Sequence, residues 1–61
     1  MQVTELSKFE MKEYRFIEFL LQKGHGDSAK GRAKTWLDAA KGKENLLTKR
    51  RAALAQLGMH I

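Results

Sequence analysis

Apolar residues recur at helical spacing in three segments of the chain, and each segment is followed by a glycine. Within a segment each of them has another three, four or seven positions away, which places them on one side of a helix. They are Phe9, Phe16, Ile17, Leu20 and Leu21 in the first segment, Ala29, Ala33, Trp36, Leu37 and Ala40 in the second, and Leu46, Leu47, Ala53, Leu54 and Leu57 in the third. No segment shows the period of two that a half-buried strand has. The pattern therefore predicts an all-α fold.

Capping residues and glycines set the boundaries of the predicted helices. Ser7 and Glu10 have the spacing of a capping box, in which the serine hydroxyl accepts from the amide of residue 10 and the glutamate reaches back to the serine amide. Asp27 or Ser28 is expected to cap the second helix and Asn45 the third. A glycine after each helix is expected to end it. The predicted helices span about residues 8–23, 28–41 and 46–57.

The short length of the chain predicts one domain, formed by residues 1–61. A domain of this size buries only about 60% of the surface that its unfolded chain exposes. The chain has no cysteine, so neither a disulfide nor a cysteine-based zinc site can stabilise it. We expect a compact three-helix domain that is held together by packing, with a homodimer as an alternative.

Two charged residues lie within the predicted apolar faces. Glu13 projects near the centre of the first face, and Arg50 projects near the centre of the third. A charge in a helix interface is costly unless it is paired, so we predict a semi-buried ion pair between Glu13 and Arg50 that fixes the packing register. In one alternative the Arg50 stem lies on apolar surface and its head reaches water. In another, Arg50 binds a carboxylate or phosphate of a partner.

Met11 and Phe19 project away from the predicted apolar face of the first helix, and Arg15 lies near them. Either both neighbouring helices pack on the first helix and its buried arc is wide, or these residues form an exposed patch. An exposed apolar patch is typical of dimerisation or partner binding. The sequence leaves both interpretations open.

Several function classes are disfavoured by what the sequence lacks. The two histidines, His25 and His60, are far apart and have no other metal-ligating residues near them. No Ser/His/Asp or Cys/His constellation is present, and so small a core offers little support for a catalytic cleft. We predict a protein that is not an enzyme, with no catalytic residues, cofactor, metal or small-molecule substrate.

The sequence also argues against a membrane association. The longest apolar run is far shorter than the roughly 20 residues of a membrane span. The first ten residues lack the basic segment leading into an apolar one that marks a secretory signal. We therefore expect a cytoplasmic location and no membrane partner.

Positive charge is concentrated in the C-terminal part of the chain. Residues 1–23 carry four basic and four acidic side chains, whereas residues 24–61 carry eight basic and three acidic ones, which gives the net charge of +5. This asymmetry indicates a polyanionic or acidic partner. Gly31 projects on the same side as three of the lysines, where its missing side chain would let a phosphate backbone approach. The candidate contacts are Lys30, Arg32, Lys34, Lys41, Lys43, Lys49 and Arg51.

The sequence fits neither the phosphate-loop motif of nucleotide-binding proteins nor the helix-turn-helix motif of DNA-binding proteins. Gly26 and Gly31 have the spacing of the phosphate-loop glycines, but Arg32 and Ala33 stand where that loop has lysine and a hydroxyl residue. No strand is predicted before this segment either. A helix-turn-helix centred on Gly42 has the wrong apolar spacing in its second helix.

The aromatic residues are expected on packing faces. Trp36 is assigned to the core, and Phe9, Phe16 and Tyr14 are assigned to the packing face of the first helix. No aromatic platform for the bases of a single strand is therefore expected. A basic helix surface is the feature that remains for nucleic-acid recognition.

Two function hypotheses follow from the sequence. The first is a nucleic-acid-binding or transcription-linked regulator that contacts phosphates through its lysine and arginine face. The second is a protein-interaction module, such as an adaptor or an inhibitor, that docks on an acidic site of a larger protein. The charge asymmetry favours the first hypothesis, and exposed positions for Met11 and Phe19 would favour the second.

Overall fold

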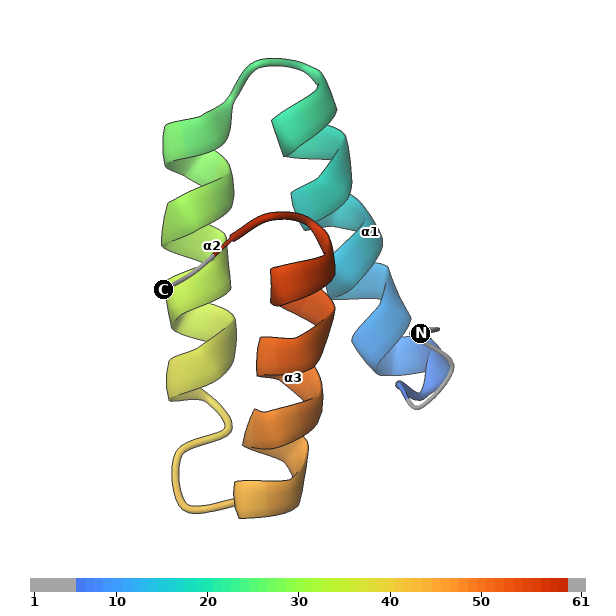
Figure 1. Ribbon diagram of the computed structural model, residues 1–61, viewed down its shortest axis with the longest axis vertical. Helices are drawn as coiled ribbons and strands as arrows, with labels where there is room; N and C mark the ends of the chain where they lie inside the picture. The colour runs from blue at the N-terminus through green and yellow to red at the C-terminus, as the bar shows by residue number, and fades with distance from the viewer. Residues whose placement is uncertain (1–5, 60–61) are drawn as a thin grey trace.

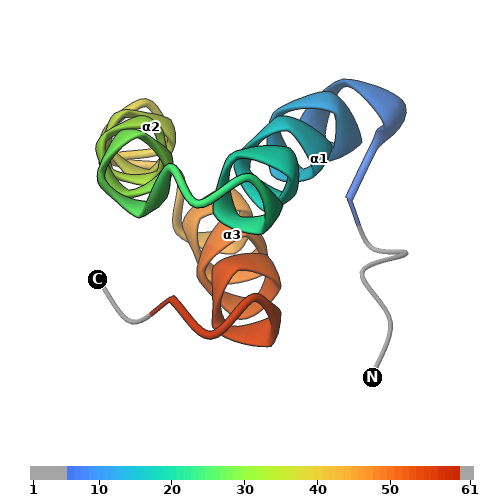
Figure 2. The same cartoon turned by 90° about the horizontal axis from the view of Figure 1, so that it is seen from above.

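Three helices make up the fold in the computed structural model, which describes residues 6–59. They are α1 (Lys8–Gln22), α2 (Gly26–Asp38) and α3 (Glu44–Gln56). The predicted all-α, three-helix fold is confirmed. Helices α2 and α3 lie side by side and run in opposite directions, while α1 diverges from α2 toward its N-terminal end (Figures 1 and 2).

The glycines predicted to follow the helices are confirmed, whereas two of the three predicted N-caps are not. Glycines with positive φ follow all three helices, namely Gly24, Gly42 and Gly58. The predicted caps of the second and third helices are wrong, because α2 begins after His25 and α3 begins after Lys43, and neither side chain caps its helix. Asp27 and Glu44 lie in the first turns instead, where a carboxylate stabilises the positive end of the helix dipole.

Helix α2 ends at Asp38, three residues before its predicted end. The chain tightens there, because the amide of Ala40 donates to the carbonyl of Leu37 (3.0 Å) and the amide of Lys41 donates to the carbonyl of Asp38 (3.1 Å). Such bonds to the third preceding residue are common where a helix closes. Lys41 therefore lies in the connection between α2 and α3 and not on a helix.

The core lies between the three helices and is built mainly from small and branched side chains. Ile17 of α1 and Leu54 of α3 are its largest fully buried residues. Alanines contribute no exposed area at two positions of α2 and allow the helices to approach closely. The core cluster consists of Leu6, Tyr14, Ile17, Ala29, Ala33, Trp36, Ala53 and Leu54.

The buried side of α1 differs from the predicted apolar face. Ile17 is buried as expected, but 81% of Phe9 and 41% of Phe16 is exposed, so the assignment of both phenylalanines to the packing face is wrong. The inward arc is centred on Glu10, Tyr14 and Ile17, which follow one another at helical spacing. At 100° per residue, Phe9 and Phe16 lie roughly 110–130° from the middle of that arc.

Candidate functional site

The two misfit charges are both paired, but with other partners than predicted. Arg50 is only 8% exposed and binds Glu10, not Glu13. Its Nε and Nη2 donate to the two carboxylate oxygens of Glu10, with Nη2 and Oε2 2.8 Å apart. The prediction of a buried pair between the first and third helices is therefore correct in its helices and in Arg50, and wrong in its acidic partner.

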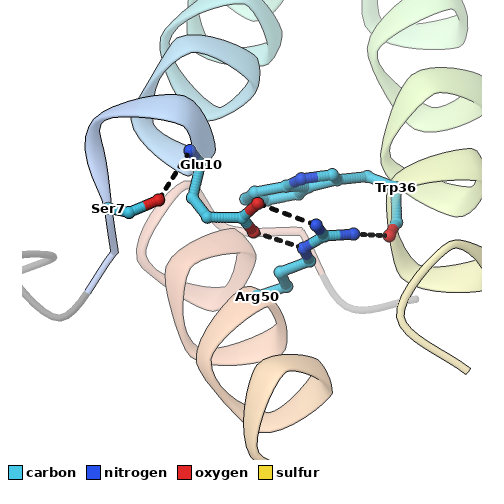
Figure 3. A network of polar contacts seen from close by, with 4 residues as sticks. All are labelled: Ser7, Glu10, Trp36 and Arg50. Carbon is cyan, nitrogen blue, oxygen red and sulfur yellow. Dashed lines mark hydrogen bonds and ion pairs between the residues drawn. The ribbon is translucent and has the colours of Figure 1, made fainter. Parts of the chain in front are cut away.

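Glu10 was expected to complete the capping box, and only half of that box is present. The amide of Glu10 donates to the Ser7 hydroxyl (3.3 Å), which caps α1 as predicted. The Glu10 carboxylate turns away from the Ser7 amide and faces Arg50 (Figure 3). Two charge-assisted hydrogen bonds in a half-buried place stabilise the carboxylate more than one bond to an exposed amide.

Arg50 also closes the C-terminal end of α2. Because the Ala40 amide bonds to Leu37, the carbonyl of Trp36 is left without the usual donor four residues on. Arg50 Nη1 donates to that carbonyl (Figure 3), and the guanidinium lies 5.1 Å from the centre of the Trp36 ring. A cation is favourable at a helix C-terminus. One side chain of α3 thus binds both α1 and α2.

Glu13 pairs with Arg32 and joins α1 to α2. Arg32 Nε and Nη2 donate to the Glu13 carboxylate at 2.9 and 3.1 Å. The hydrogen bond to Glu13 and then its negative charge raise the pKa of Arg32. The Arg32 side chain is 51% exposed, and its guanidinium lies 4.5 Å from the centre of the Phe16 ring. Arg32 is at the surface, as its predicted role as a partner contact requires, but two of its nitrogens already face a carboxylate.

The solvent-facing side of α1 carries basic, aromatic and amide side chains but no acidic one. Its exposed residues, together with the next residue, are Lys8, Phe9, Lys12, Arg15, Phe16, Phe19, Gln22 and Lys23, and we call this set the outer face of α1. All three acidic residues of the helix, Glu10, Glu13 and Glu18, are partly buried. From residue 8 to residue 23, four basic side chains therefore face water while three acidic ones are partly buried.

Each phenylalanine of the outer face has a cation beside it. The Lys12 ammonium lies 6.0 Å from the centre of the Phe9 ring, and the Lys23 ammonium lies 5.7 Å from that of Phe19. The rings of Phe16 and Phe19 are stacked, with centres 6.4 Å apart and planes inclined by 22°. The premise of the expected absence of an aromatic platform, that Phe9 and Phe16 lie on the packing face, is therefore wrong.

The predicted interaction patch of Met11, Arg15 and Phe19 is present only in part. Arg15 is exposed and Phe19 is 49% exposed. Met11 is partly buried and packs against the core cluster, to which Leu6 belongs. Met11 therefore belongs to the edge of the core, and Phe19 belongs to the outer face of α1.

The other predicted basic contacts are exposed, but they do not share one helix face. Lys41 and Lys43 lie outside the helices, since α2 ends at Asp38 and α3 begins at Glu44. Lys49 and Arg51 are two residues apart on α3, so they project toward opposite sides of it. Only one pair lies one turn apart on a single helix. That pair is Lys30 and Lys34 on α2.

A groove of about 320 Å³ lies between α1 and α2, beside the Glu13–Arg32 pair. Gly31 lines it within α2, and a β-carbon added at this glycine would meet no atom within 4 Å. The space left by the missing side chain of Gly31 is therefore part of the groove that Arg32 also lines. The groove is lined by Glu13, Gly31, Arg32, Thr35, Trp36 and Ala39.

Residues 6–59, the part of the chain that the structure describes, contain no group of three or more histidine or acidic residues that could hold a metal ion. The same residues contain no helix long and apolar enough to cross a membrane. Comparison with protein-family models, with curated proteins and with solved structures finds no match to this chain.

The outer face of α1 carries a signal in the sequence that the apolar pattern obscured. At 100° per residue, Phe9, Lys12, Phe16, Phe19 and Lys23 fall within one arc of about 80°. The acidic residues of the helix fall outside that arc. Plotting charge around the helix, rather than summing it along the chain, would have separated this face from the packing face.

Proposed function

We propose that the protein binds nucleic acid through the outer face of α1. One observation supports this proposal above the others: the exposed side of α1 carries four cations and no acidic residue. The two carboxylates nearest to α2 and α3, those of Glu10 and Glu13, are neutralised by Arg50 and Arg32. A polyanion that approaches the middle of this face therefore meets basic and aromatic side chains, while the partly buried Glu18 lies at its edge.

The size of the face suits a run of phosphates. Lys8 and Lys23 are fifteen residues apart, which corresponds to about 22 Å along a helix. A cation that neutralises a phosphate releases a condensed counterion, and this release drives binding. The exposed lysines of α2, together with the net charge of +5, add a field that attracts a polyanion from a distance. A binding protein, such as a regulator, fits these features better than an enzyme.

Fluorescence anisotropy with labelled oligonucleotides tests the proposal. Four phosphate contacts predict that affinity falls about 50- to 150-fold when salt rises from about 50 to about 200 mM. Replacing Lys12 and Lys23 by glutamine should make this salt dependence shallower. The matched control replaces Lys30 and Lys34, which removes the same charge from α2 and should have the smaller effect. Absence of binding at low salt would refute the proposal.

A second candidate function is docking on an acidic site of another protein. The groove beside Arg32 favours it, because a concave and largely apolar site next to an exposed phenylalanine can receive a side chain of a partner. Titration with poly-glutamate under the same conditions separates the two candidates. Tighter binding to poly-glutamate than to any oligonucleotide would favour the protein partner. Light scattering after size exclusion tests the homodimer, which like charges on two outer faces would oppose.

A further inference from the structure

We infer that the outer face of α1 takes single-stranded rather than double-stranded nucleic acid, with unpaired bases stacked on its phenylalanines. This inference rests on the nucleic-acid binding proposed above and specifies the form of the ligand. It is carried by the aromatic rings of the face, whereas the binding proposal is carried by its cations.

The distribution of aromatic residues is the first step. The chain has three phenylalanines, and all of them are exposed on the outer face of α1. Trp36 and Tyr14 are buried and supply the aromatic part of the core. The phenylalanines are therefore not part of the core, although the Phe16 ring also lies against the Arg32 guanidinium.

The chemistry of phenylalanine favours an unpaired base. In a duplex the flat faces of the bases are covered by their neighbours, and only edges with hydrogen-bonding groups are open in the grooves. Phenylalanine has no polar group with which to bind those edges. In a single strand the flat faces are open, and stacking on aromatic side chains is the usual way in which proteins hold them.

The positions of the cations fit the same ligand. A cationic group lies 4.5–6.0 Å from the centre of each phenylalanine ring, contributed by Lys12, Lys23 and Arg32. A base stacks on the other face of a ring or displaces the cation that lies over it, and in either position the cation is near the phosphate of that base. Ten residues separate Phe9 from Phe19, or about 15 Å along the helix, which matches roughly four or five nucleotides of a stacked strand.

Other occupants fit this face less well. A second copy of the chain would bring its own four cations against these four. An interfacial membrane helix separates its apolar face from its charged face, whereas here lysines and phenylalanines occupy the same arc. An acidic protein surface would satisfy the cations but offers no row of flat rings to the phenylalanines.

The test compares one labelled strand of roughly ten nucleotides, about twice the distance from Phe9 to Phe19, alone and annealed to its complement. We expect the single strand to bind about tenfold more tightly or better. The double variant Phe16→Ala/Phe19→Ala should lower single-strand affinity about tenfold or more and leave duplex affinity nearly unchanged. The matched control, Phe16→Leu/Phe19→Leu, keeps apolar bulk without flat rings and should also bind weakly.

Folding of the variants is checked by circular dichroism and by the emission of the buried Trp36. Phe9→Ala provides a second measurement, since a side chain that is 81% exposed contributes little to the core, and it should weaken single-strand binding as well. Duplex binding as tight as single-strand binding, or alanine variants without effect, would overturn this inference and leave nucleic-acid binding intact. If neither form binds at low salt, both proposals fail. Binding to poly-glutamate or to anionic vesicles would then identify the competing class of partner.

Discussion

Two pairs of arginine and glutamate join the helices, and they are built from the same groups. In each pair two guanidinium nitrogens donate to one carboxylate, and each guanidinium lies over an aromatic ring. They differ in burial. The side chains of Arg50 and Glu10 are 9% and 18% exposed, whereas those of Arg32 and Glu13 are 51% and 26% exposed.

This difference in burial assigns the two pairs to different tasks. Loss of Arg50 would leave the Glu10 carboxylate and the Trp36 carbonyl without their donor in a place that water reaches poorly. Loss of Arg32 would leave Glu13 beside an open groove, where water can replace the guanidinium. We conclude that Arg50 contributes more to the packing of the helices than Arg32 does.

Replacing each arginine by alanine gives the largest contrast. Arg50→Ala should lower the free energy of unfolding by about 3–5 kcal/mol, because it leaves an uncompensated buried charge. A small domain has little more stability than that, so much of this variant should be unfolded. Arg32→Ala should cost less than about 1 kcal/mol, as surface pairs do. Urea unfolding followed by circular dichroism and Trp36 emission measures both, and equal losses would refute the distinction.

Double-mutant cycles with milder changes identify the partners. Glu10→Gln and Arg50→Lys should be coupled by about 1–3 kcal/mol, because they belong to one hydrogen-bonded group. Glu13→Gln with Arg50→Lys should be additive within about 0.5 kcal/mol. The coupling between Glu13→Gln and Arg32→Lys should be small and should decrease further in high salt. Strong coupling of Glu13 to Arg50 would restore the pairing expected from sequence.

The sequence predicts the helices of this fold well, because the signals that define them are local. Three glycines with positive φ follow helices whose apolar residues recur every three or four positions. The partner of Arg50 cannot be predicted from such local signals. Glu10 satisfies a capping rule and also lies at the centre of the buried arc, and only the position of α3 decides which role its carboxylate takes.

The candidate site was harder to predict, since α1 has two arcs that contain apolar residues. Hydropathy alone ranks phenylalanine above tyrosine and so selects the arc with Phe9 and Phe16. In the folded domain, Tyr14 and Ile17 pack against α2 and α3 in place of the phenylalanines. Which arc is buried depends on contacts with residues far away in the sequence, and a helical pattern does not contain that information.

A substitution at Gly31 should have the smallest effect on the contrast between the Arg32 and Arg50 pairs. It is also the most specific, because Gly31 lines the groove beside Arg32. Glycine inside a helix costs about 0.5–1 kcal/mol relative to alanine, and a β-carbon at Gly31 would meet no atom within 4 Å. Gly31→Ala should therefore raise the free energy of unfolding by roughly that amount. The control, Gly42→Ala, should lower it by about 1–2 kcal/mol, since Gly42 has a φ of +85°.

The affinity of the same Gly31→Ala variant tests whether this glycine contributes to ligand binding. If the groove receives a side chain of a protein partner, the added methyl group narrows it, and affinity for poly-glutamate should fall severalfold while stability rises. Substitutions of Arg50 should not change stability and affinity in opposite directions. Any loss of affinity in those variants should follow from a loss of folded protein. A Gly31→Ala variant that gains stability and binds as tightly as the original chain would show that this glycine has no part in binding. The role of Arg32 would then have to be tested without reference to the groove.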